Sequence, residues 1–97
     1  MKINDHEFIL VYAYDGTCLT DVDLLSKLVA VRDGLAAQES VSACDVYTNE
    51  QLVAIASFKP TTEQMYAVLS GFGVRDWERG GKAMVDAVIK HLDPIGQ

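Results

Sequence analysis

The chain has 97 residues, with 14 Asp and Glu against 8 Lys and Arg, which gives a formal net charge of −6. This length predicts a single domain that spans residues 1–97. The hydrophobic fraction of 49% is that of a folded protein and excludes a disordered acidic tail. The excess of acidic residues argues against a basic protein that wraps nucleic acid.

The sequence carries no sign of a membrane or secretory segment. No stretch approaches the roughly 18 apolar residues that a transmembrane helix needs, and the first seven residues lack the apolar region of a signal peptide. Two cysteines, Cys18 and Cys44, are too few for the disulfide framework of a small secreted domain. We therefore expect a cytoplasmic protein with reduced thiols and no membrane partner.

Three apolar runs predict β-strands. Residues 8–14, FILVYAY, are apolar throughout and end at Asp15-Gly16, a turn signal, which predicts a strand covered on both faces. Residues 41–48 and 52–58 are also β-like, and the three residues between them predict a hairpin loop. The second run of this hairpin is the more apolar and is predicted to be central.

A helix is predicted over residues 20–37. Its apolar side chains recur at positions i, i+4, i+7 and i+11, which places Leu24, Leu28, Val31 and Leu35 in one stripe. Thr20 is the predicted N-cap residue.

Two more helices are predicted in the second half. One begins at about residue 60, where Thr61 and Gln64 have the spacing of a capping box. The last begins after Asp76 and ends before Pro94. Gly80 and Gly81 lie near its start and either delay the helix or permit close packing.

These elements give the order β-α-β-β-α-α. The predicted fold class is α+β, with a three-stranded mixed, mainly antiparallel sheet that resembles a truncated ferredoxin-like split βαβ unit, and with helices packed on it. Two apolar sheet faces need cover, either from the last helix or from a second copy of the chain, so a homodimer is one solution. The topology by itself predicts no activity.

The candidate catalytic and metal-binding residues form no motif. Cys18 follows the first strand and precedes a helix, where the helix dipole can stabilise a thiolate, but a phosphatase-type loop needs an arginine where Leu24 stands. His6 and His91 lie near opposite ends of the chain and lack zinc-site spacing. We therefore expect no enzyme, cofactor or metal, and Cys18 is the only nucleophile that an enzymatic alternative would use.

The acidic excess lies in the first part of the chain. Residues 1–58 hold nine acidic and three basic residues, whereas residues 59–97 hold five of each. A strongly negative face steers a protein toward a basic groove, although acidic residues also simply keep a small protein soluble. Seven carboxylates are predicted to contact a protein partner: Asp15, Asp21, Asp23, Asp33, Glu39, Asp45 and Glu50.

In its size, its acidity and its lack of a catalytic motif, the chain resembles phage-encoded inhibitors of bacterial defence, including anti-CRISPR DNA mimics. That resemblance implies a non-enzymatic inhibitor in the host cytoplasm that occupies the basic surface of a nucleic-acid-binding complex. Such an inhibitor contacts no nucleic acid directly. The alternative is a homodimeric small-ligand-binding protein, with a pocket lined by Tyr12, Tyr14, Tyr66 and Trp77.

Overall fold

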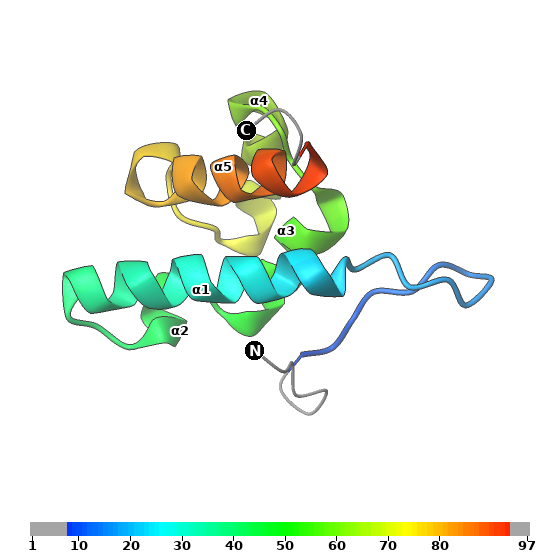
Figure 1. Cartoon of the computed structure of the whole chain (residues 1–97), viewed down its shortest axis with the longest axis horizontal. Coiled ribbons are helices and arrows are strands. Elements are labelled where there is room, and N and C mark those ends of the chain that lie inside the picture. Colours follow the sequence, from blue (N-terminus) through cyan, green and yellow to red (C-terminus); the bar gives the residue numbers. More distant parts are fainter. Residues whose placement is uncertain (1–7, 94–97) are drawn as a thin grey trace.

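The computed structural model describes residues 8–93 and consists mainly of helices (Figure 1). In chain order these are α1 (Val22–Glu39), α2 (Ala43–Val46), α3 (Asn49–Phe58), α4 (Glu63–Ala67) and α5 (Gly81–Leu92), with the 3₁₀ helices η1 (Val68–Phe72) and η2 (Trp77–Arg79) before α5. Over residues 8–93 the β-structure is limited to one isolated bridge, between Tyr12 and Cys18. The predicted α+β fold with a three-stranded sheet is therefore wrong.

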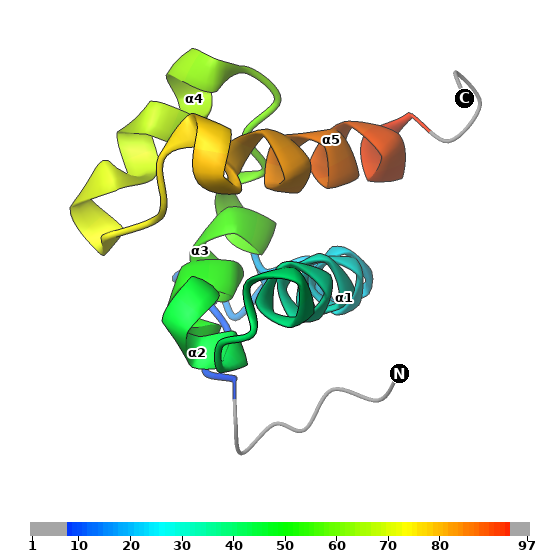
Figure 2. The ribbon, with the colours of Figure 1, turned by 90° about the vertical axis from the view of Figure 1, so that its left-hand side faces the viewer.

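Helix α1 confirms the helix predicted over residues 20–37. Its N-cap is Asp21 rather than Thr20, because Asp21 Oδ1 accepts the Leu24 N–H at 3.0 Å. Leu24, Leu25 and Leu28 are fully buried where α1 packs against α3 and α5. Figure 2 looks almost along α1 and shows α3 beside it and α5 lying across it.

The hairpin predicted over residues 41–58 is instead the pair of helices α2 and α3. Thr48 starts α3 with a capping box, in which Thr48 Oγ1 accepts the Gln51 N–H at 3.2 Å and Gln51 Oε1 accepts the Thr48 N–H at 2.9 Å. This motif satisfies two N–H groups that would otherwise lack partners at the helix start. The apolar run that follows then buries a helical stripe: Leu52, Val53, Ile55 and Ala56.

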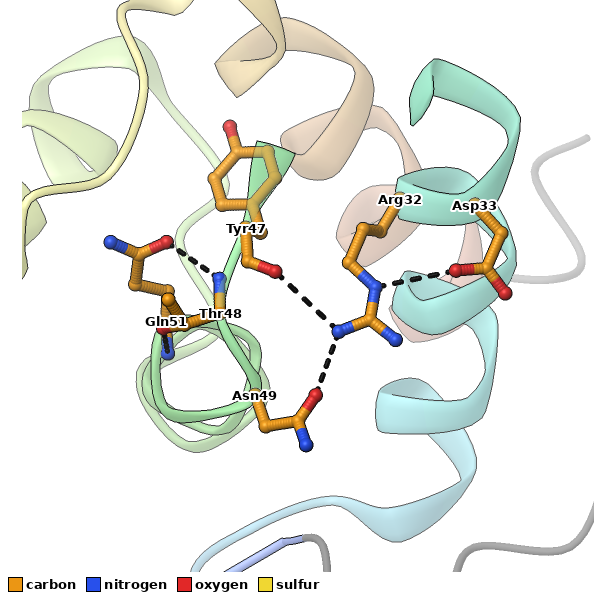
Figure 3. Close-up of polar contacts among 6 residues, drawn as sticks. All are labelled: Arg32, Asp33, Tyr47, Thr48, Asn49 and Gln51. Carbon is orange, nitrogen blue, oxygen red and sulfur yellow. Dashed lines mark hydrogen bonds and ion pairs between the residues drawn. The ribbon is translucent and has the colours of Figure 1, made fainter. Parts of the chain in front are cut away.

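A buried arginine joins α1 to the start of α3 (Figure 3). Arg32 is 8% exposed, and its Nη1 lies 2.7 Å from Asn49 Oδ1 and 3.5 Å from the Tyr47 carbonyl oxygen. Its Nε lies 3.3 Å from Asp33 Oδ1. Because each contact accepts a proton from the guanidinium, the charge is compensated while α1 is fixed against α3.

Residues 8–20 form a hairpin-like arm that precedes α1. The Leu19 N–H donates to the Val11 carbonyl and the Ala13 N–H donates to the Thr17 carbonyl, both at 2.7 Å. The strand predicted over residues 8–14 is wrong because the described chain offers no sheet for this run to join. Phe8 is buried in the core, but Tyr14 at the tip is fully exposed, and the arm projects beyond the helices (Figure 1).

The second half begins and ends close to the predicted positions. Helix α4 starts after Thr62, whose Oγ1 accepts the Met65 N–H at 3.1 Å, so the capping box predicted for Thr61 and Gln64 is wrong. Helix α5 ends before Asp93, as predicted. None of the described helices is long and apolar enough to span a bilayer.

Gly81 allows α5 to pack directly on α4. A Cβ atom at Gly81 would lie 2.6 Å from the ring of Tyr66, a buried residue of α4. The Tyr66 hydroxyl donates to the Arg75 carbonyl at 2.6 Å, so it accepts the proton of the buried Tyr47 hydroxyl at 2.8 Å. Both phenols stay neutral, because burial is the main cause that raises the pKa of Tyr47 and the pKa of Tyr66.

Candidate functional site

The seven carboxylates predicted to contact a partner are spread over the arm and three helices. Asp15 lies in the turn of the arm, Asp45 on α2 and Glu50 on α3, and the other four lie along α1 or at its N-cap. Asp15 Oδ1 accepts the Thr17 N–H at 2.9 Å, so it stabilises that turn. Asp23, Asp45 and Glu50 are exposed. A role of the seven residues in partner binding stays a prediction.

Asp21 links the two ends of the helical body. Its Oδ2 lies 2.8 Å from Nε2 of His91 on α5, and His91 Nδ1 lies 2.9 Å from Nζ of Lys27. Since the Lys27 ammonium donates to Nδ1, the imidazole proton lies on Nε2 and is donated to Asp21. Burial raises the pKa of Asp21, but the hydrogen bonds from Leu24 and His91 outweigh that effect and the pKa falls below its usual value.

The four aromatic residues predicted to line a ligand pocket do not come together. Tyr66 and Trp77 pack edge to face, with ring centroids 6.1 Å apart. Tyr12 and Tyr14 lie on the arm and are exposed to solvent. The predicted pocket lined by all four side chains is therefore wrong, and Trp77 is the one that reaches a different groove, described below.

The residues considered for catalysis and metal binding remain unconnected. Cys18 and Cys44 are free and exposed, and Cys18 Sγ donates to the Thr20 carbonyl at 3.4 Å. Among residues 8–93, no group of three or more His, Cys, Asp or Glu could hold a metal ion. His6 lies outside the described residues.

The strongest candidate site is a groove where η2 meets α5, here called the η2–α5 groove. Its volume is about 460 Å³, and Trp77, Arg79, Gly80 and Lys82 line it opposite the last turns of α1. Arg75, Arg79 and Lys82 lie within eight positions of each other and supply three of the seven Lys and Arg among residues 8–93. This short segment therefore combines cations, a half-buried indole and glycine at a helix N-terminus.

Ion pairing leaves the η2–α5 groove much less acidic than the whole chain. Arg75 Nη1 and Nη2 lie 2.6 and 2.8 Å from the two carboxylate oxygens of Glu39, so this acid at the groove edge is neutralised. The hydrogen bonds from Arg75 are the main cause that lowers the pKa of Glu39. Arg79 and Lys82 are exposed and form no ion pair with another described residue.

The chemistry of the η2–α5 groove suits an anion with an attached ring. Arg79 and Lys82 can contact phosphate oxygens, and the indole of Trp77 offers a flat apolar face. Gly80 is the N-cap of α5 and makes no side-chain cap bond, so the positive end of the helix dipole faces the groove uncapped. Glu78 and Asp86 also line the groove and offset part of the positive charge.

Comparison with known proteins identifies the class of this fold. Residues 21–88 match the HRDC domain, and the chain belongs to that family. It is 35% identical over 74 residues to the ATP-dependent DNA helicase UvrD2 of Mycobacterium tuberculosis and of Mycobacterium bovis. It is 26% identical over 77 residues to the ATP-dependent DNA helicase RecQ of Pasteurella multocida. No solved structure matches the chain.

These relatives are much longer than the chain. The aligned part is 74% of this chain but 11% of UvrD2, and 79% of this chain but 12% of RecQ. The chain thus corresponds to a small accessory part of each helicase. The arm, residues 8–20, lies outside the residues matched to the family, whereas the whole η2–α5 groove lies inside them.

The family overturns the predicted functions. An HRDC domain is associated with nucleic acid and occurs in helicases of the RecQ and UvrD type. The chain is therefore neither an anti-CRISPR-like DNA mimic of phage origin nor a homodimeric ligand-binding protein. The expectation that it makes no direct contact with nucleic acid is contradicted as well.

Proposed function

We propose that this domain is a non-catalytic accessory module that binds DNA through the η2–α5 groove. The match of residues 21–88 to the HRDC domain carries this proposal, because the matched part contains every residue that lines the groove. The printed names of the relatives, DNA helicases, favour DNA as the nucleic acid. In that role the domain holds the strand while other parts of an assembly act on it.

The net charge of −6 limits how tightly the domain can bind by itself. Each phosphate that approaches meets the repulsion of the whole chain, and only Arg79 and Lys82 face it in the groove without an ion pair. Binding is therefore weak, strongest at low ionic strength and driven by few phosphate contacts. Stacking of a base on Trp77 adds an attraction that salt does not screen.

The test is the binding of fluorescein-labelled single-stranded oligothymidylate, followed by fluorescence anisotropy at several salt concentrations. The double variant Arg79→Ala, Lys82→Ala is expected to bind at least about tenfold more weakly, which corresponds to about 1.4 kcal/mol. Loss of two phosphate contacts reduces the salt slope by about 0.7 per contact. Lys90→Ala is the matched control, because Lys90 is exposed on the same helix but lies outside the groove.

Two results would contradict the proposal. One is the absence of binding by the unmodified protein at low ionic strength. The other is an equal loss of affinity in Lys90→Ala and in the double variant, which would mean that charge alone, rather than the groove, determines binding.

A further inference from the structure

A second, chemically different groove lies between the arm, α3 and η1, and is here called the apolar groove. Its volume is about 530 Å³. Six apolar side chains define its walls and floor: Ile9, Val11, Val53, Phe58, Val68 and Phe72. Ile9, Val68 and Phe72 are 89%, 68% and 51% exposed. Such a cluster of exposed apolar side chains on a small domain marks an interaction surface.

Hydrogen bonds hold the walls of the apolar groove in place. Gln51 Nε2 donates to the Phe72 carbonyl at 3.0 Å and so ties the start of α3 to the end of η1. On the arm side, the Val11 N–H donates to Thr20 Oγ1 and the Thr20 hydroxyl contacts Ser57 Oγ on α3, both at 2.8 Å. The groove is therefore formed before any partner arrives, which lowers the entropic cost of binding.

We propose that the apolar groove docks an amphipathic helix of a protein partner, one with an apolar stripe and with Lys or Arg beside it. The floor of the groove is one face of α3 from Glu50 to Phe58, which is about 12 Å long at 1.5 Å per residue. That length matches two turns of a bound helix with apolar anchors at i, i+3 or i+4, and i+7. Because both long walls are helical, a third helix can pack its ridge between them.

Charge decides between this partner and its rivals. Glu50, exposed in the first turn of α3, is the charged residue that lines the apolar groove. A lysine or arginine on the partner helix complements it. A second copy of the chain would bring a further charge of −6 toward the first and is repelled. Nucleic acid is disfavoured too, because no Lys or Arg lines the apolar groove to neutralise a phosphate.

The arm makes this surface a feature of the present chain. Ile9 and Val11 form one wall, and both precede the residues matched to the HRDC domain. The groove therefore goes beyond the function proposed for the η2–α5 groove, with which it shares no lining residue.

The probe is a synthetic helical peptide with leucines at i, i+3, i+4 and i+7 and with lysines beside them. A second peptide carries glutamates in place of the lysines. Fluorescence anisotropy is expected to show micromolar binding of the lysine peptide and at least tenfold weaker binding of the glutamate peptide. Val68→Asp is expected to weaken the lysine peptide at least tenfold, and Glu50→Gln about threefold, with a smaller salt dependence.

The control is Leu92→Asp, which places the same charge at an exposed apolar residue of α5 outside the groove. Circular dichroism confirms that each variant is folded, which the exposure of Val68 and Leu92 allows. Equal affinities of Val68→Asp and Leu92→Asp would overturn the proposal, as would tighter binding of the glutamate peptide. Sedimentation of the unmodified chain as a dimer that Val68→Asp dissociates would overturn it in favour of a second copy.

Discussion

The two grooves of this small domain differ in the side chains that each leaves without a partner inside the protein. The η2–α5 groove presents Arg79, Lys82 and the indole of Trp77. The apolar groove presents aliphatic and phenyl groups with one carboxylate, Glu50. Phosphate can be neutralised in the first and not in the second, and an apolar helix face can be buried in the second and not in the first.

This difference teaches that the net charge of a chain is a poor guide to what each surface binds. Glu39 contributes to the acidic total, but the fold pairs it with Arg75 from a segment 36 positions away. Asp21 likewise belongs to a cap and to the contact with His91. The charges that remain unpaired at a given groove are local, and a domain of charge −6 can therefore carry a site for phosphate.

The largest expected effect breaks the packing beneath the η2–α5 groove. In Gly81→Ala the new methyl group would overlap the Tyr66 ring, which a Cβ would approach to 2.6 Å. We expect a loss of about 3 kcal/mol in the free energy of unfolding, because neither the helix nor the buried ring can shift without strain. Urea unfolding followed by circular dichroism measures it.

Gly34→Ala is the matched control for that variant. Gly34 lies within α1, and a Cβ there meets no atom within 4 Å. Replacement is expected to leave stability unchanged or to raise it by up to about 1 kcal/mol, since alanine is the better helix former. Equal destabilisation of both variants would show that α5 is not packed on Tyr66 as closely as the structure places it.

A pair of aromatic truncations sharpens the comparison between the two grooves. Trp77→Ala is expected to weaken oligothymidylate binding by about 2 kcal/mol through the loss of base stacking, and to leave binding of the lysine peptide unchanged. Phe72→Ala is expected to do the reverse, because the two grooves share no lining residue. If either variant weakened both ligands equally under conditions where it stays folded, the grooves would not be independent.

The fold could be predicted only in part, and the two apolar runs show why. Residues 8–14 and 52–58 both have the composition of a strand, and a run of this length cannot be told from a buried helix by periodicity. The difference lies in what precedes the run. Thr48 and Gln51 have capping-box spacing, the same signal that was assigned to Thr61 and Gln64, and they start α3. Once residues 52–58 are helical, residues 8–14 have no sheet to join.

Helix α1 was predictable because its apolar stripe continues over several turns, whereas the candidate site was not. Trp77 was singled out as an aromatic residue, but with the wrong companions. Arg75, Arg79 and Lys82 lie close together in the sequence, and counting charge over the whole second half, which is neutral, concealed them. The pairing of Glu39 with Arg75 depends on a contact that only the fold creates.

The smallest expected effect concerns Asp21, which holds the ends of α1 and α5 together away from both grooves. Its pKa in the folded protein lies below the ordinary value of 3.8, because hydrogen bonds from Leu24 and His91 outweigh its burial. Its stabilising contribution is therefore fully present above the unfolded pKa and is lost as the pH falls through the folded pKa. Asp21→Asn keeps an N-cap acceptor and loses only the charge, so we expect a loss of about 1 kcal/mol or less at neutral pH.

The measurement for Asp21→Asn is thermal unfolding of both proteins between about pH 7 and pH 2, a range that crosses the titration of Asp21. The difference in Tm is expected to be constant down to about pH 5 and to shrink below pH 4, where the aspartate of the unmodified chain is protonated. Glu39 titrates in both proteins and so cancels from the difference. Since neither groove contains Asp21, affinities for oligothymidylate and for the lysine peptide should not change. A Tm difference that persisted undiminished at pH 2 would mean that Asp21 acts through its shape as a cap and not through its charge.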